Sequence, residues 1–349
     1  MKKKLLVIFI IIFLIVSTYV AVEMLVPAQA GNRNIEIEVP KGATFKQAVQ
    51  ILYNQKLIRD KNIFLLMGRL TGADKKIRAG YYSITGSLSP LNILKMLKSG
   101  QIIEYEITVL ERDSLREIAE KLSGKGIINI EDFIRLSSDE DFLSSYNIEA
   151  PTFEGYLFPD TYKIPKGMDP EDAIGMMINR MREKISAKLY ARASELGLSE
   201  REVVTLASII EKEAVTDEER PHISAVYHNR LKKGIRLQAD PTCIYGVKSS
   251  GEKITAKDLQ RKTPYNTYII NGLPPGPIAS PGIKSIIAAL YPSKVPYIYF
   301  VSNNDGTHQF SVTAKEHLAA VKSYRAKKSR YTSGENKEGT EEGKERNGL

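Results

Sequence analysis

The sequence predicts a mixed α+β protein that follows an N-terminal transmembrane helix, and three features indicate this architecture. An uninterrupted apolar run comes first. A strand-like segment followed by a capped helix then occurs twice. Finally, a series of helices gives way to a loop-rich segment and a β-rich run, an order typical of α+β folds. With 349 residues, the chain is long enough for two folded units besides its termini.

The apolar run extends from Leu5 to Val22 and follows three lysines at positions 2–4. At about 1.5 Å per helical residue, it nearly spans a hydrocarbon core of about 30 Å. The lysines predict a cytoplasmic N-terminus and an extracytoplasmic body. A cleaved signal peptide is the alternative, because Ala28-Gln29-Ala30 fits the cleavage pattern. The run is longer than the roughly 7–15 apolar residues of a signal peptide, so we expect residues 1–26 to form a cytoplasmic tip and a retained single-pass anchor.

Two strand–helix units follow, with the strand-like alternation of residues 35–39 repeated at 105–109. Each alternating segment precedes a helix that opens with a capping box, formed by Thr44 and Gln47 in the first unit and by Ser114 and Glu117 in the second. No second strand is evident after either helix. The unit resembles LysM, a small glycan-binding module, and residues 33–104 are accordingly predicted to form a LysM-like subdomain. A purely structural role for both units remains the alternative.

Further helices are predicted in the central part of the chain. Asp169 and Pro170 open a long helix that runs to about Leu196, and Ser199 with Glu202 opens the next one through another capping box.

The remainder is predicted to be mostly loop, with short strands, from about residue 237 to 281. A helix then starts at Ser280-Pro281 and runs to about Leu290, and residues 297–301 form a buried strand. Residues 324–349 contain almost no apolar side chains, which predicts a disordered tail.

Composition narrows the classes of partner and cofactor. The formal charge of +9 suits an anionic partner, but no dense Lys/Arg stripe with interleaved aromatic residues is present, so a nucleic-acid partner is not expected. The single cysteine excludes an internal disulfide, and four scattered histidines without an HExxH motif give no reason to expect a metal. No nucleotide or dinucleotide motif is present, so no cofactor is expected.

Two carboxylates stand out on the predicted helix from Glu202 to Ala214. At about 100° per residue, Glu211 falls on one flank of its wide apolar face and Glu213 on the other. Burial raises the pKa of a carboxyl group, which is what a general acid near neutral pH requires. Solvated or paired charges at a helix end are the ordinary alternative, and periodicity cannot choose between the two residues.

Several motifs in a fixed order resemble the MltG-type (YceG-like) endolytic murein transglycosylases. The resemblance runs from the anchor to about residue 322. It rests on the segments Ala207–Glu213, Glu154–Tyr162, Asn229–Leu231, Leu237–Thr242, Ile244–Gly246, Tyr265–Tyr268 and Gly272–Ile278.

The resemblance implies that residues 105–323 form a catalytic domain with Glu211 as the catalytic acid/base. It implies cleavage within glycan strands, between N-acetylmuramic acid and N-acetylglucosamine, to leave 1,6-anhydro ends. It also implies that cutting nascent strands terminates their elongation, which is consistent with a peptidoglycan synthase as partner. We expect Glu213 in a supporting role, and we expect substrate contacts, or alternatively plain turn chemistry, from Gln238, Asp240, Tyr265 and Asn266.

Three other functions remain open. A membrane-anchored, non-catalytic peptidoglycan-binding scaffold would use the same anchor and the same strand–helix units. An exported hydrolase would pair Glu211 with Glu213 or Asp240. A serine or cysteine peptidase is disfavoured, because Ser208 lies outside a G-x-S-x-G motif and Cys243 has no evident histidine partner.

Overall fold

The computed structural model describes residues 2–248 and 252–326, which pack as two compact units. Unit 1 comprises the described residues up to Ile107 together with Tyr162–Asp169, and unit 2 comprises the others. The boundary falls within two paired strands, β3 (Glu104–Val109) and β4 (Asp160–Pro165). Helices and two-stranded sheets build both units, which confirms the predicted α+β class.

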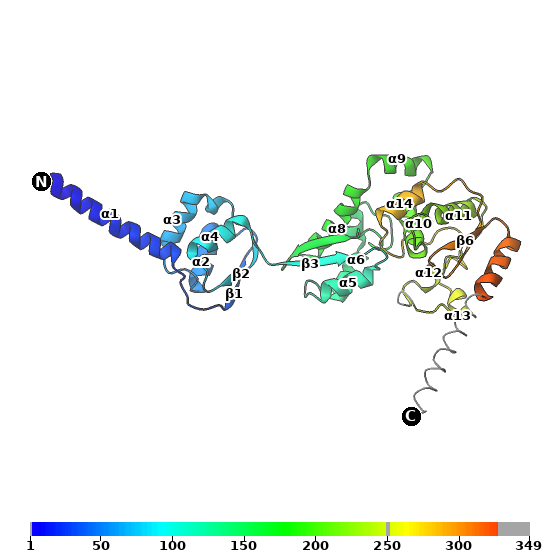
Figure 1. Cartoon of the computed structure of the whole chain (residues 1–349), viewed down its shortest axis with the longest axis horizontal. Coiled ribbons are helices and arrows are strands. Elements are labelled where there is room, and N and C mark those ends of the chain that lie inside the picture. Colours follow the sequence, from blue (N-terminus) through cyan, green and yellow to red (C-terminus); the bar gives the residue numbers. More distant parts are fainter. Residues whose placement is uncertain (1, 249–251, 327–349) are drawn as a thin grey trace, which may run out of the picture. The chain divides into compact units, whose positions relative to one another are not determined.

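Helix α1 (Lys2–Leu25) begins unit 1, and its apolar side chains are exposed along almost its whole length. Figure 1 shows it projecting from the rest of its unit. Its length and composition are sufficient to cross a membrane, as predicted, so it is a candidate membrane anchor. The orientation of the chain in a membrane stays a prediction.

The rest of unit 1 is a two-stranded antiparallel sheet covered by helices. Its core lies between one face of the sheet and the helices, where Ile37 and Tyr82 are register partners and are almost fully buried. The second strand was not evident in the sequence, because only two of its residues, Tyr82 and Ile84, are buried in the core. The elements are β1 (Asn34–Val39), α2 (Phe45–Asn54), α3 (Lys61–Thr71), η1 (Ala73–Lys75), β2 (Gly80–Thr85) and α4 (Pro90–Ser99).

The predicted strand–helix repeat is present. Strands β1 and β3 have the same alternation of exposed and buried side chains, and the capping boxes at Thr44 and Ser114 both form. Equivalent residues of the two intervening turns have left-handed backbones, Gly42 at φ 79° and Arg112 at φ 75°. Whether residues 33–104 act as a LysM-like module stays a prediction.

Unit 2 is mainly helical. Its elements are α5 (Leu115–Ser123), α6 (Ile130–Ser137), α7 (Glu140–Ser145), α8 (Pro170–Lys184), α9 (Ala187–Glu195), α10 (Glu200–Glu213), α11 (Arg220–Lys232), α12 (Asp240–Ile244), α13 (Ala256–Leu259), α14 (Ile283–Leu290), β5 (Tyr299–Ser302) and β6 (His308–Ser311).

Three local predictions for unit 2 were wrong. The long helix ending near Leu196 is divided into α8 and α9, because the extended backbone at Ser186 starts a new helix. The described part of the segment 237–281 contains the short helices α12 and α13 and no strand. The β-rich run forms β5, which is only half-buried because it pairs with β6 alone. The predicted tail lies outside the described residues from residue 327 onwards.

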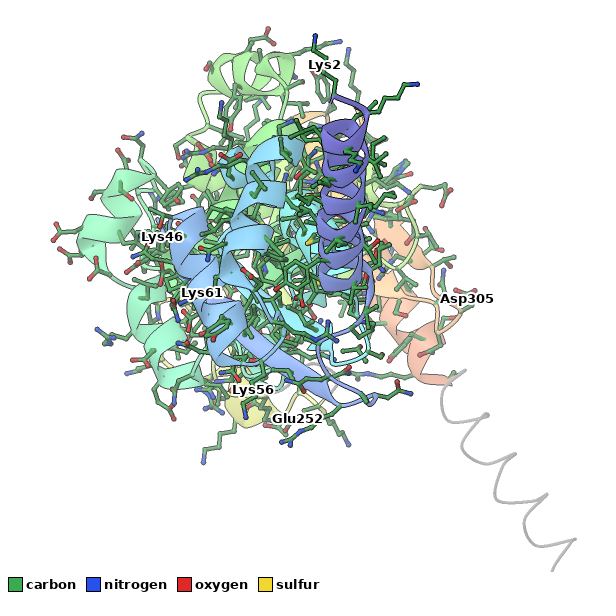
Figure 2. All side chains as sticks on the ribbon, turned by 90° about the vertical axis from the view of Figure 1, so that its left-hand side faces the viewer. Lys2, Lys46, Lys56, Lys61, Glu252 and Asp305 are labelled. Carbon is green, nitrogen blue, oxygen red and sulfur yellow. The ribbon has the colours of Figure 1, made fainter. Side chains whose placement is uncertain are left out.

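Basic side chains are prominent on the helical side of unit 1. Figure 2 is a view from the side where α1 begins, and it shows Lys46 on α2, Lys56 in the turn after α2 and Lys61 at the start of α3. Lys46 and Lys56 are exposed, and Lys61 lies over the ring of Tyr53.

Candidate active site

Helix α10 runs through the core of unit 2 and carries both carboxylates that the sequence singled out. Its predicted capping box forms between Ser199 and Glu202. All side chains from Val203 to Glu211 are buried, and α9, α11, α12 and α14 contact the helix. Because α10 is held on so many sides, it fixes the positions of Glu211 and Glu213 at its C-terminal end.

Glu211 is almost fully buried, and both of its carboxylate oxygens accept hydrogen bonds. Its side chain is 2% exposed, and Oε1 accepts a hydrogen bond from Nη1 of Arg220 at 2.9 Å. Oε2 accepts one from the backbone N–H of Gly282, also at 2.9 Å. Arg220 additionally contacts Asp217 at 3.0 Å and the hydroxyl of Ser285. These contacts form a buried ion pair that connects α10 to α11 and to the start of α14.

Glu213, two residues further on, lies in a different environment. Its side chain is partly exposed, and the hydroxyl of Tyr227 donates to Oε1 at 3.3 Å. The backbone N–H of Asp240 also donates to its carboxyl group. Burial, and then the nearby carboxylate of Asp240, raise the pKa of Glu213 to about 7. A carboxyl group with this pKa holds a proton in a substantial fraction of molecules at neutral pH.

The segment that leads into α12 carries the predicted substrate contacts Gln238 and Asp240, and Asp240, the first residue of α12, lies beside Glu213. Both side chains are exposed, and the hydroxyl of Tyr268 donates to Asp240 Oδ1. Gln238 has a left-handed backbone at φ 48°, and Nη1 of the buried Arg230 donates to its Oε1 at 3.3 Å. A non-glycine residue in this conformation is strained and is kept there by its surroundings.

The other two predicted contacts are placed differently. Tyr265 is half-buried, and its ring packs against that of Tyr245 at a centroid distance of 4.6 Å. Asn266 is fully buried, and its amide donates to the backbone carbonyls of Leu259 and Arg261 at 3.1 and 2.8 Å. The side chain of Asn266 therefore maintains the shape of its loop.

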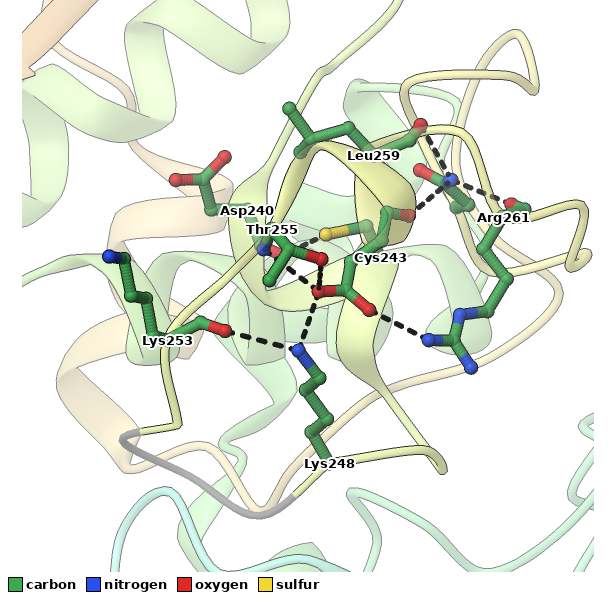
Figure 3. Close-up of polar contacts among 9 residues, drawn as sticks. Asp240, Cys243, Lys248, Lys253, Thr255, Leu259 and Arg261 are labelled. Atoms are coloured by element: carbon green, nitrogen blue, oxygen red, sulfur yellow. Dashed lines mark hydrogen bonds and ion pairs between the residues drawn. The ribbon is translucent and has the colours of Figure 1, made fainter.

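A buried carboxylate organises the same loop region. The side chain of Asp258 accepts hydrogen bonds from Lys248, Thr255 and Arg261 at 2.6 to 2.7 Å. Figure 3 shows these three donor side chains and their contacts as dashed lines. These hydrogen bonds hold the pKa of Asp258 well below its usual range, and the bond from Lys248 has the largest effect. The loop is thus built on an ionised group that remains charged at all physiological pH values.

The role of the turn between β3 and α5 was not predicted from the sequence. The backbone of Arg112 bonds to Ser280, and its guanidinium donates to the carbonyl of Lys212 at the end of α10. Burial, and then the nearby Glu211 carboxylate, raise the pKa of Glu111. The carboxyl end of Glu111 lies close to Gly282, where an added Cβ would be 1.9 Å from its Oε1. Contacts between residues 100 positions apart have no signal in a single sequence.

Glu154 is another buried carboxyl group. The sequence analysis did not single it out, although it begins one of the motifs that resemble the family. Both of its oxygens accept from the backbone N–H of Leu115, and the hydroxyl of Tyr245 donates to it at 2.9 Å. Burial raises the pKa of Glu154 to about 7. Its position at the start of α5 indicates a role in holding that helix.

The peptidase alternative has little support in the structure. Ser208 is fully buried, where its hydroxyl donates to the carbonyl of Thr205 and accepts from the N–H of Ile278. Cys243 is buried as well, and burial raises the pKa of its thiol to about 11, which disfavours the reactive thiolate. In the described ranges, 2–248 and 252–326, no group of three or more His, Cys, Asp or Glu side chains has the geometry to hold a metal ion.

A protonatable carboxyl at the end of a rigid core helix, beside exposed polar loop residues, defines a class of protein: one equipped for general acid–base chemistry. The chain matches the YceG-like family over residues 37–323 and belongs to that family.

Similar proteins agree with this family membership. The chain is 31% identical over 320 residues to a Bacillus subtilis protein named endolytic murein transglycosylase, covering 86% of this chain and 88% of the relative. A Streptococcus pneumoniae protein of the same name is 28% identical over 84% of this chain, which spans only 59% of that longer relative. The crystal structure of a putative YceG-like protein from Listeria monocytogenes matches with a TM-score of 0.57 and 32% identity, over 83% of this chain and 99% of the other.

Proposed function

We propose that this protein is a membrane-anchored lytic transglycosylase that cuts peptidoglycan glycan strands internally. The observation that carries the proposal is Glu213, a partly exposed carboxyl with a pKa of about 7 at the end of α10. The names of the similar proteins from B. subtilis and S. pneumoniae support the same activity.

The proposed reaction needs one carboxyl group that acts twice. Protonated Glu213 donates its proton to the oxygen of the bond between N-acetylmuramic acid and N-acetylglucosamine, and that bond breaks. The resulting carboxylate takes the proton of the C6 hydroxyl of the muramic acid. The C6 oxygen then bonds to C1 and leaves a 1,6-anhydro end. No water is consumed, and Glu213 finishes in its starting protonation state.

This mechanism moves the acid/base role from Glu211, which the family resemblance favoured, to Glu213. Both oxygens of Glu211 accept hydrogen bonds and its side chain is 2% exposed, which favours the more exposed Glu213 as the group that meets the glycosidic oxygen. We assign to Glu211 the structural task of fixing the last turn of α10 through Arg220 and Gly282.

The substrate contacts follow from the exposed groups around Glu213. Asp240, placed by its own backbone bond to Glu213, and Gln238, whose amide oxygen is anchored by Arg230, are proposed to bind hydroxyl and acetamido groups of the sugars. Tyr265 is proposed to line the same region, whereas Asn266 supports the loop from within.

The proposed membrane topology and partners of the protein are those predicted from its sequence. The candidate anchor α1, with three lysines at its N-terminal end, supports a single-pass protein with a cytoplasmic N-terminus and an extracytoplasmic catalytic unit. Cleavage of nascent strands would terminate their elongation, with a peptidoglycan synthase as partner. The strand–helix–helix–strand order of unit 1 supports a LysM-like, glycan-binding role for residues 33–104.

The test compares Glu213→Gln with Glu211→Gln in the detergent-solubilised full chain, incubated with uncrosslinked glycan strands. Mass spectrometry identifies the new strand ends, and circular dichroism checks folding. We expect anhydro ends from the unmodified chain and an activity loss of about 100-fold to 10,000-fold for a fully folded Glu213→Gln. We expect Glu211→Gln to lose activity only in proportion to its loss of folded protein.

Each alternative predicts a different result. Reducing ends would indicate a hydrolase and refute the transglycosylase mechanism. Strand binding without cleavage would favour the non-catalytic scaffold. A folded Glu211→Gln variant without activity, beside an active Glu213→Gln variant, would return the acid/base role to Glu211.

A further inference from the structure

Helix α3 has an unusual distribution of apolar side chains. Phe64 and Gly68 face the core of unit 1, where Gly68 allows close contact with the ring of Phe45. On the opposite face, Leu66 and Leu70 lie one helical turn apart and are 52% and 72% exposed. A surface helix of a soluble domain normally presents polar residues on its outer face, so this face of α3 requires an apolar or amphipathic partner.

The end of α1 is fixed against the same part of unit 1. Val20 and Met24 pack against the core of the unit, and α1 contacts both α3 and α4. The hydroxyl of Tyr19 bonds to the side chain of Asp60, which caps the start of α3. Arg59 donates to the carbonyl of Val26 at 3.3 Å and also bonds the next carbonyl. The start of α3 therefore lies level with the last two turns of α1.

The length of α1 places this contact at a membrane boundary. The apolar run from Leu5 to Val22 covers about 27 Å as a helix, slightly less than a hydrocarbon core of about 30 Å. If the run spans the bilayer, residues from Tyr19 onwards lie at the outer edge of the core. The start of α3, at the level of Tyr19, then lies at the depth of the lipid headgroups.

Basic side chains surround the exposed leucines. Arg69 lies on the outer face of α3, and Lys75 and Lys76 follow its C-terminal end, all three exposed. Lys98 of α4 donates to the carbonyl of Thr71, the last residue of α3. Acidic groups nearby include Glu23, Asp60 and Asp74, but Asp60 caps α3, and Glu23 and Asp74 each have an oxygen buried in the unit. The patch therefore presents cations and apolar groups together, a combination that suits anionic phospholipids.

We propose that the outer face of α3 binds the anionic phospholipid surface of the leaflet in which α1 ends. Leu66 and Leu70 enter the headgroup layer, and Arg69, Lys75 and Lys76 contact the phosphates. The inference rests on the proposed role of α1 as a retained membrane anchor and is independent of the proposed transglycosylase activity.

The chain contains no tryptophan, so a single introduced one reports on its own surroundings. The test uses Leu70→Trp in the full chain, reconstituted through α1 into nanodiscs of phosphatidylglycerol and phosphatidylcholine. Its matched control is Ser83→Trp, on the exposed face of β2 that points away from the core of unit 1. We expect a blue-shifted emission for Leu70→Trp and severalfold stronger quenching by lipids brominated close to the headgroup. Leu70→Trp with the emission and quenching of Ser83→Trp would overturn the proposal.

A second comparison tests the charges. Adding Arg69→Glu and Lys76→Glu to Leu70→Trp should reduce the quenching in anionic discs to the level found in discs of phosphatidylcholine alone. Equal quenching of the parent Leu70→Trp in both types of disc would refute the anionic headgroups as the ligand. Strand cleavage, measured separately on the same discs, reports on the proposed function without affecting either outcome.

Discussion

The two sides of the last turn of α10 carry the same residue type in opposite electrostatic settings. On one side, Glu211 is sealed in an ion pair with Arg220 and a backbone bond from Gly282. On the other, Glu213 is partly exposed, faces the carboxylate of Asp240, and has a pKa raised to about 7. Burial is the largest influence on the pKa of Glu213, and the two residues also differ in their neighbours: Glu211 has a cation beside it and Glu213 a carboxylate. A compensating cation favours the ionised form, whereas a second carboxylate favours the protonated one.

The largest effect is expected from breaking the buried ion pair between Glu211 and Arg220. Arg220→Met removes the cation and leaves the Glu211 carboxylate buried without its partner, which should cost about 3–5 kcal/mol of unfolding free energy. Urea denaturation followed by circular dichroism measures this loss. Glu213→Gln is the matched control and should change stability far less, because its carboxyl has no cationic partner among its hydrogen bonds. Equal losses for both variants would contradict the contrast between the two sides.

The dependence of stability on pH sharpens the comparison further. The pKa of Glu213 is about 7 in the folded protein against a usual value of 4.5, so the folded state binds more protons than the unfolded state between these values. The free energy of unfolding should therefore decline as pH rises from about 4.5 to about 7. Glu213→Gln should flatten this decline, and Glu154 should supply the part that remains. A profile unchanged by Glu213→Gln would show that the pKa of Glu213 is not raised.

A third prediction concerns the dependence of activity on pH. If Glu213 is the general acid, activity falls as pH rises through its pKa, because the proton is lost. Asp240→Asn removes a carboxylate that raises this pKa and should move the alkaline limb of the pH–rate profile to lower pH. Asp217→Asn alters the Glu211 side only and should leave the limb in place. The opposite pattern would identify Glu211 as the acid.

The smallest expected effect is a shift of the pH–rate profile in the opposite direction. The hydrogen bond from Tyr227 lowers the pKa of Glu213, so Tyr227→Phe should move the alkaline limb to higher pH. The same pH–rate measurement detects the change, and the direction distinguishes it from Asp240→Asn. A shift towards lower pH would mean that Tyr227 favours the protonated form instead.

Local structure was predictable wherever the determining residues are close in sequence. The capping boxes at Thr44, Ser114 and Ser199 all formed, because each depends on residues three positions apart. The break between α8 and α9 was missed, since Ser186 is an ordinary helix-surface residue by pattern. The same limit applied to Arg112, whose left-handed backbone in place of the glycine at position 42 is stabilised by contacts with distant parts of unit 2.

The sequence by itself determined the candidate anchor, the α+β class and the helix that bears two carboxylates at its end, because apolar periodicity and helix caps act over a few residues. Only the tertiary structure decided what distinguishes Glu211 from Glu213. The groups that do so come from α11, from Asp240 at the start of α12 and from Gly282, which is 71 positions away from Glu211. A pKa depends on charges and burial in space, and neither follows from the order of residues along a helix.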